Sequence, residues 1–115
     1  MADLVIYEKP TCTTCRKLSL LLAERGIEAD RVDYHVTGLT ETEIRDLLAK
    51  ADARPRDILR TREPAYAEYV ADRDLGDDEL VALMAEHPEL VQRPIVVRGD
   101  RAVLARPVER VLELL

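Results

Sequence analysis

The two cysteines of this 115-residue chain, Cys12 and Cys15, form a Cys-x-x-Cys motif. A short apolar run at residues 4–7 precedes the motif and an amphipathic pattern follows it, so a strand is expected to give way to a helix here. The free backbone N–H groups of a first helical turn favour a thiolate over a thiol at the first cysteine. The motif therefore predicts a reactive Cys12. Four neighbours are expected to support it, three of them by positive charge: Lys9, Thr11, Arg16 and Lys17.

Cys15 is predicted to be a resolving thiol with a higher pKa than Cys12. Thiols three residues apart at the start of a helix lie on the same side of its first turn, near enough to close a disulfide. Cys15 can then attack a sulfur adduct on Cys12. Two other roles stay open: Cys15 can simply pack beneath the helix, or both cysteines can be inert core residues.

A structural zinc site is a weaker alternative, because it usually needs four ligands. The only further candidates are His35 and His87, which do not have the spacing of a zinc finger. His35 is instead expected on the outward face of a strand, as an ordinary surface residue. We therefore expect no metal and no bound cofactor.

Size and charge exclude several classes of protein. The net charge of −6 and the pI near 4.9 argue against general binding to nucleic acid or anionic lipid. No apolar run approaches the length of a membrane span, and no signal peptide is recognisable. We expect a cytoplasmic protein, in which a cysteine pair is more often catalytic or sensing than a permanent crosslink.

Apolar periodicity and turn residues predict the elements of the first half. The first is a strand at 4–7 that is buried on both faces, and the second is a helix that Thr13 or Thr14 caps and Gly26 ends. A strand follows at 31–36, with Val32, Tyr34 and Val36 on one face. The next helix begins with a capping box formed by Thr40 and Glu43.

The second half is predicted in the same way. It comprises short helical pieces near 56–60 and 64–70, a helix capped by Asp77 or Asp78 that ends near His87, strands at 94–98 and 101–105 joined by Gly99-Asp100, and a last helix from Pro107 with Val108, Val111, Leu112 and Leu115 on one face.

This order of elements predicts a small mixed four-stranded sheet with helices on its faces. The arrangement is that of the α/β class with a thioredoxin-like, glutaredoxin-type fold. We expect a single domain spanning 1–115, with a helical insertion at about 40–90.

Over nearly its whole length the chain resembles the arsenate reductases that work with glutathione and glutaredoxin, together with their relatives, the Spx-type regulators. The resemblance rests on Cys12, on Arg60 and, above all, on the block at 93–97 with the sequence Arg-Pro-Ile-Val-Val. The resemblance rests also on Arg106 and Pro107, which begin the last helix.

The resemblance implies that a Cys12 thiolate attacks arsenate held by Arg60, Arg93 and Arg106. Glutathione then joins, and glutaredoxin supplies the last electrons. If Cys15 closes a disulfide with Cys12, a dithiol reductant such as thioredoxin or glutaredoxin could recycle the enzyme. A guanidinium fork suits a tetrahedral oxyanion better than an ammonium does. Arg62 is a rival to Arg60, and the bond before Pro94 is expected to be cis.

Two positions depart from the arsenate reductase pattern. Glu8 stands where those enzymes carry a His, and its charge is expected to oppose the Cys12 thiolate. Cys15 is a feature of the Spx type. An Spx-like regulator that binds RNA polymerase and uses the two cysteines as an oxidation switch is therefore the alternative. Arg106 favours the enzyme, because a third arginine for anion binding has no evident place in a redox switch.

Overall fold

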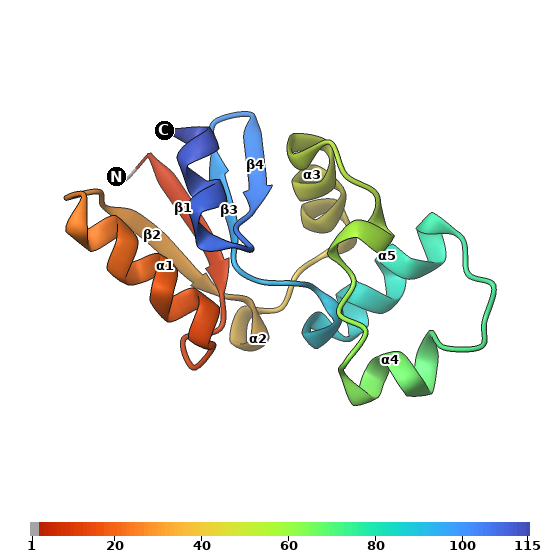
Figure 1. Cartoon of the computed structure of the whole chain (residues 1–115). Helices are drawn as coiled ribbons and strands as arrows, with labels where there is room; N and C mark the ends of the chain where they lie inside the picture. Colours follow the sequence, from red (N-terminus) through yellow and green to blue (C-terminus); the bar gives the residue numbers. More distant parts are fainter. Residues whose placement is uncertain (1–2) are drawn as a thin grey trace. The chain divides into compact units, whose positions relative to one another are not determined.

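The computed structural model describes residues 3–115 (Figure 1). Contacts divide the chain into two compact units. The first, here called the sheet unit, comprises residues up to Thr37 together with Arg93–Leu115. The second, the helical unit, is Gly38–Gln92, close to the insertion that the sequence predicts at about 40–90.

The sheet unit contains a mixed four-stranded sheet of order β2-β1-β3-β4. Its strands are β1 (Leu4–Glu8), β2 (Ala29–Asp33), β3 (Ile95–Arg98) and β4 (Arg101–Leu104). β1 runs parallel to β2, which follows it through a helical crossover, and antiparallel to β3. β3 and β4 form the antiparallel hairpin predicted at Gly99-Asp100, where Gly99 adopts the positive φ of 61° that the turn requires. The predicted thioredoxin-like fold is confirmed.

One face of this sheet is covered by α1 (Thr13–Glu24) and by the final helix η3 (Val108–Leu114) (Figure 1). Buried aliphatic side chains from both helices and from three strands form one core: Leu4, Ile6, Leu18, Leu22, Val96, Val103, Ala105, Val111 and Leu114. The core is aliphatic, as expected for a chain whose only aromatic residues besides histidine are four tyrosines.

The first strand and its helix differ in detail from the prediction. β1 extends to Glu8, and its burial alternates, so that Val5 and Tyr7 remain partly exposed. Cys12 occupies the N-cap position of α1, so the prediction of a threonine cap is wrong. Gly26 closes α1 as predicted, with a φ of 67° and its N–H donating to the Ala23 carbonyl at 3.1 Å.

The predicted strand at 31–36 is wrong in its second half. Strand β2 ends at Asp33, which pairs with Glu8, the last residue of β1. Beyond Glu8 the β1 chain turns away, so an extension of β2 would have no hydrogen-bonding partner. Residues Tyr34–Thr37 form the short helix α2 instead, which buries Tyr34 completely and leaves Val36 81% exposed.

The last helix forms where it was predicted, but it is a 3₁₀ helix, so the predicted face is wrong. Three residues per turn align Val108, Val111 and Leu114, rather than the α-helical set. Val111 and Leu114 are buried, whereas Leu112 and Leu115 are 37% and 46% exposed.

The helical unit contains α3 (Glu41–Ala51), η1 (Pro55–Ile58), α4 (Pro64–Tyr69), α5 (Asp77–Glu86) and η2 (Pro88–Leu90). The Thr40–Glu43 capping box is confirmed by reciprocal hydrogen bonds of 3.1 Å. The cap of α5 is Gly76 rather than either aspartate, and Glu79 accepts a bond from its N–H. α3 packs on α5, and both contribute buried aliphatic residues. Of the helices in residues 3–115, none is long and apolar enough to cross a membrane.

Candidate active site

Cys12 lies at the junction of the β1–α1 loop and the helix. Its backbone N–H donates to the Lys9 carbonyl at 2.9 Å, which closes the loop, and its own carbonyl accepts from Arg16 N–H at 3.0 Å as the helix begins. This N-cap position places the partly exposed thiol next to the free N–H groups of the first turn.

The pKa of Cys12 is lowered from 9.0 to about 7. Partial burial alone would raise it, but several hydrogen bonds to the sulfur favour the thiolate and outweigh that effect. They come from the Cys15 N–H, the Cys15 thiol, the Arg93 guanidinium and the Thr14 N–H. About half of Cys12 is therefore a nucleophilic thiolate at neutral pH.

Cys15 lies in the first turn of α1 and is only 1% exposed. Burial, together with the nearby Cys12 and the charge of Glu8, raises its pKa to about 12, although an interaction with the Lys9 backbone opposes the shift. The two thiols thus have the order of acidity that the sequence predicts. Glu8, however, acts on Cys15, whereas the sequence led us to expect an effect on Cys12.

Arg93 is the central cation of the sheet unit's site and is 7% exposed. Its guanidinium bonds the Cys12 sulfur and interacts with Tyr34, and both contacts raise the arginine's pKa against the effect of burial. Nη1 lies 3.5 Å from His35 Nε2. Within residues 3–115, its buried Nε has no hydrogen-bond partner, which is uncommon for a charged donor.

Arg106 supports Arg93 from the end of the β-hairpin. Its Nη1 donates to the Arg93 carbonyl at 2.9 Å. The peptide bonds before Pro94 and before Pro107 are both cis. Arg106 and Lys17 also line a surface pocket of about 380 Å³, together with Thr14, Pro107, Val108 and Glu109. Cationic side chains therefore border a hollow next to the start of α1.

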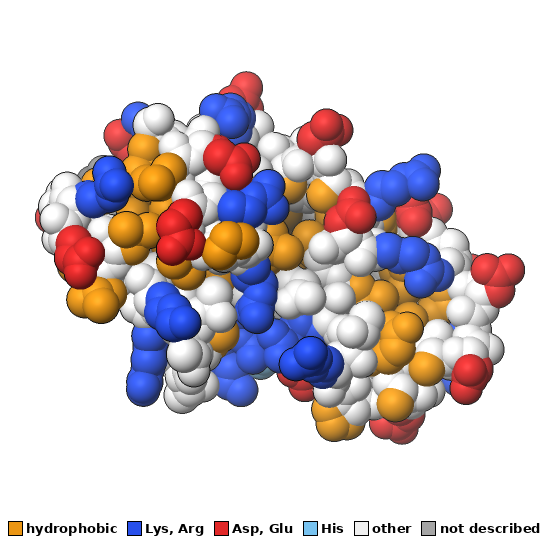
Figure 2. Space-filling model, viewed as in Figure 1, with side chains coloured by type: hydrophobic (Ala, Val, Ile, Leu, Met, Phe, Trp, Pro, Cys, Tyr) orange, Lys and Arg blue, Asp and Glu red, His pale blue; other side chains and the backbone are white. Residues whose placement is uncertain are grey.

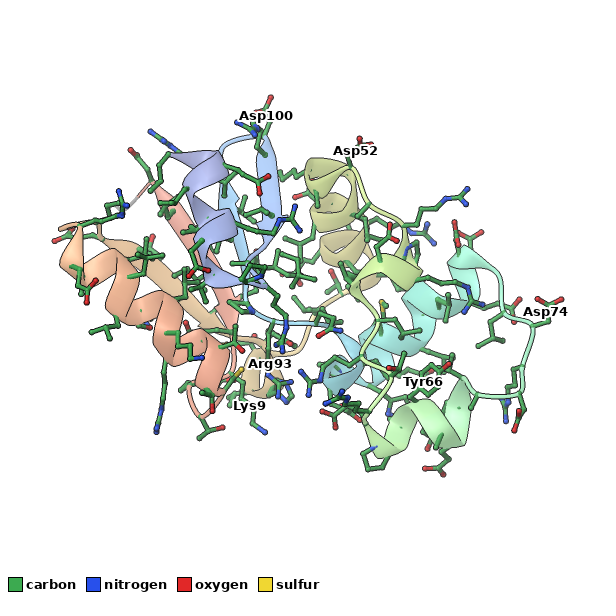
Figure 3. The ribbon with its side chains drawn as sticks, viewed as in Figure 1. Lys9, Asp52, Tyr66, Asp74, Arg93 and Asp100 are labelled. Atoms are coloured by element: carbon green, nitrogen blue, oxygen red, sulfur yellow. The ribbon has the colours of Figure 1, made fainter. Side chains whose placement is uncertain are left out.

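The other residues predicted to support Cys12 lie in the loop before α1 or in its first turns. Lys9 is partly exposed, and Thr11, Arg16 and Lys17 are exposed. Figure 3 shows Lys9 and Arg93 near the loop that precedes α1. In Figure 2, the charged side chains along the lower edge of this unit are mostly Lys and Arg, whereas basic and acidic side chains are mixed higher up. The local field thus opposes the net charge of −6 and suits an anion.

Arg60 belongs to the helical unit. Its backbone N–H donates to the Leu90 carbonyl at 2.7 Å, and its side-chain Nε donates to Glu63 Oε1 at 3.0 Å in an ion pair. The exposed Arg62 lies in the same unit. The structure therefore joins Cys12, Arg93 and Arg106 within one unit, while the convergence of Arg60 or Arg62 on them stays a prediction.

His35 was wrongly expected to be an ordinary surface residue. Its ring packs on Tyr34 with the centroids 4.8 Å apart, and it approaches Arg93. The sequence pattern could have predicted this position of His35, because neighbouring parallel strands end at the same edge of a sheet. Residues just after β2 must then lie near the loop that follows β1.

In the part of the chain that the structure describes, no group of three or more His, Cys, Asp or Glu side chains is arranged to hold an ion. The described site provides a thiol with a lowered pKa, a buried second thiol and the guanidinium of Arg93.

Known proteins resemble this chain over nearly its whole length. The family model described as ArsC family matches residues 7–114. An arsenate reductase of Neisseria meningitidis is 34% identical over 96% of this chain and 97% of its own. The uncharacterized protein YfgD of Escherichia coli K12 is 37% identical over 95% and 93%. The solved structure of an arsenate reductase from Vibrio cholerae has a TM-score of 0.91, with 38% identity over 97% of both chains.

Fold and site together define a thiol oxidoreductase of the thioredoxin-like class, with a thiol of lowered pKa at the start of α1. Within that class, the chain belongs to the ArsC family.

Proposed function

We propose that this protein is a thiol-dependent arsenate reductase in which the Cys12 thiolate attacks arsenate. One observation carries the proposal: a thiol with a pKa of about 7 bonds a buried arginine that retains a free charged N–H, in a chain of the ArsC family. The relatives named arsenate reductase cover nearly the whole chain and support the same reaction.

The reaction balances as a two-electron reduction. Cys12 sulfur forms a bond to As(V), and an arsenate oxygen leaves as water. A thiol reductant then displaces a second oxygen. When the sulfur ligands are released as a disulfide, their two electrons stay on arsenic, and As(III) leaves as arsenite. The enzyme has to provide a thiolate at neutral pH and to stabilise the oxyanion's charge.

Arg93 and Arg106 are proposed to bind the oxyanion, and Arg60 to join them from the helical unit, with Arg62 as its rival. The free Nε of Arg93 supports this role, because a buried charged donor without a partner is costly unless a ligand satisfies it. Lys9, Thr11 and Arg16 support the site through charge and position. The family match spans both units, so we propose that they work as one domain.

The electron donors are proposed to be glutathione with glutaredoxin, or thioredoxin. Cys15 would act as a resolving thiol, closing a disulfide with Cys12 that a dithiol reductant reopens. These donors are kept reduced in the cytoplasm, where we place the enzyme.

The decisive experiment measures arsenite formed from arsenate by the purified chain with glutathione and glutaredoxin. Cys12→Ser should abolish it, whereas Arg110→Met, which removes an exposed charge from η3, should not. The Spx-like alternative is tested on the same preparation by a pull-down with RNA polymerase. Polymerase binding without arsenite formation would overturn the proposed function.

A further inference from the structure

The guanidinium of Arg93 is buried without a carboxylate beside it. Arg93 is 7% exposed, and within residues 3–115 no Asp or Glu side chain forms an ion pair with it. A buried charge is costly unless hydrogen bonds or an opposite charge compensate it. The Nε atom has no hydrogen-bond partner in the same part of the chain. The orientation of this cation therefore depends on the few polar groups that contact it.

One of these groups is the imidazole of His35. His35 Nε2 lies 3.5 Å from Arg93 Nη1. An imidazole nitrogen accepts a hydrogen bond only when it carries no proton, so a bond here requires the neutral ring that is protonated at Nδ1. The distance is long for a hydrogen bond, and the positive charge of the donor strengthens the interaction.

The ring of His35 is held by the residue that precedes it. It packs on the ring of Tyr34, with the centroids 4.8 Å apart and the planes tilted by 44°. Tyr34 is completely buried and also interacts with Arg93. Both residues belong to α2, which begins where β2 ends at Asp33. This short helix thus brings two side chains to Arg93, and the first of them supports the ring of the second.

A neutral acceptor suits an anion site better than a carboxylate would. A carboxylate would bind a guanidinium more strongly, but its negative charge would repel a bound anion. The imidazole of His35 can orient the guanidinium of Arg93 and still leave its positive charge available. Cys12 already benefits from that charge, because its sulfur is hydrogen-bonded to Arg93.

We propose that His35 is a positioning residue, whose neutral Nε2 accepts a hydrogen bond from Arg93 and directs the guanidinium toward Cys12 and the oxyanion. The inference rests on the oxyanion-binding role proposed for Arg93. In this role His35 acts through Arg93 and transfers no proton. The proposal gives a function to a histidine that the sequence alone would place on the surface.

Two substitutions separate the acceptor from the ring. His35→Phe keeps a ring that can pack on Tyr34 but has no acceptor. His35→Gln has an amide oxygen at about the reach of Nε2 but no ring. If His35 acts as an acceptor, His35→Gln should resemble the wild type and His35→Phe should not. If its ring only fills space beside Tyr34, the reverse is expected.

The first measurement is the rate of Cys12 alkylation by iodoacetamide against pH, in a Cys15→Ser background. His35→Phe should raise the Cys12 pKa by about half a unit, which about halves the rate at pH 7. The second is the protection of Cys12 from alkylation by added sulfate, a tetrahedral dianion. Sulfate binding should weaken about fivefold in His35→Phe, and about tenfold or more in His35→Glu because the new carboxylate pairs with Arg93. His35→Gln should stay within about twofold of the wild type in both measurements.

A matched control is available on the same helix. Val36→Ala changes the next residue, which is 81% exposed, and should leave both measurements unchanged. Thermal melting checks that each variant folds. If His35→Phe does not fold, His35→Gln and His35→Glu still decide, because equal sulfate binding by these two variants would overturn the proposal.

The proposal is also overturned if His35→Phe matches the wild type in both measurements, or if His35→Gln departs from the wild type as far as His35→Phe does. Neither measurement needs arsenite to form. A chain that forms no arsenite but shows the expected order of variants would therefore count against the proposed function and still support the role of His35.

Discussion

Replacement of Arg93 by methionine should raise the pKa of Cys12. Arg93 donates one of the hydrogen bonds that hold this pKa at about 7. Methionine fills much of the same buried space without the charge. The lost bond is worth about 1.5 kcal/mol, at the low end for a charged group because Cys12 is partly exposed. That energy corresponds to about one pKa unit.

The expected consequence is a smaller thiolate fraction. At pH 7 about half of wild-type Cys12 is thiolate, against roughly a tenth in Arg93→Met. Alkylation by iodoacetamide should therefore be about fivefold slower at pH 7 and equal at about pH 10, where both proteins are ionised. The rate is best measured against pH in a Cys15→Ser background, so that only one thiol reacts.

Two controls show whether the effect belongs to the hydrogen bond. Arg110→Met removes the same charge from η3, where Arg110 pairs with Glu113 at 3.1 Å, and should leave the Cys12 profile unchanged. Arg93→Lys keeps the charge without the guanidinium fork, so its Cys12 pKa should lie between those of the wild type and Arg93→Met. An unchanged profile in Arg93→Met, or an equal shift in Arg110→Met, would refute the reasoning.

Three further predictions concern stability, measured by denaturant unfolding. Leu114→Ala should lower the free energy of unfolding by roughly 2–4 kcal/mol and Leu112→Ala by less than about 1 kcal/mol, because only Leu114 is buried. The reverse order would contradict the assignment of Leu114 to the buried face of the 3₁₀ helix. Thr40→Ala should cost about 1 kcal/mol through loss of the capping box, and no cost would mean that the cap contributes nothing. Because the pKa of Glu8 is raised, its carboxyl group stays protonated to higher pH in the folded chain than in the unfolded chain. The stability that this protonation contributes is present below about pH 4.5 and is lost as the pH rises through the folded-state pKa. Glu8→Gln should thus gain stability relative to wild type as the pH rises above about 4.5, and parallel curves would contradict this.

Local signals in the sequence were sufficient for several elements. The Thr40–Glu43 capping box, the Gly99 turn and the close of α1 at Gly26 all depend on interactions within a few residues. The mixed sheet followed from the order of elements and from the rules of chain connection. The resemblance carried by Arg93 to Val97 led to the family, which the comparison confirms.

Apart from the N-caps of α1 and α5, the errors fall where long-range packing decides. The alternation through Val36 was a valid strand pattern, but β2 ends at Asp33 because its neighbour β1 ends at Glu8. The 3₁₀ geometry of η3 could not be read from periodicity, since Val108 and Val111 are compatible with both helix types. Its buried face is set by the sheet beneath it.

By itself, the sequence determined which groups are available for chemistry: two thiols at the start of a helix, and arginines spaced far apart along the chain. Only the tertiary structure decided how those groups are perturbed. The pKa values of Cys12 and Cys15 diverge because one sulfur meets helix N–H groups and Arg93, while the other is buried near Glu8. The contacts between Glu8 and Arg31 and between His35 and Arg93 join residues 23 and 58 positions apart, and these depend on strand register and burial, to which no local pattern responds.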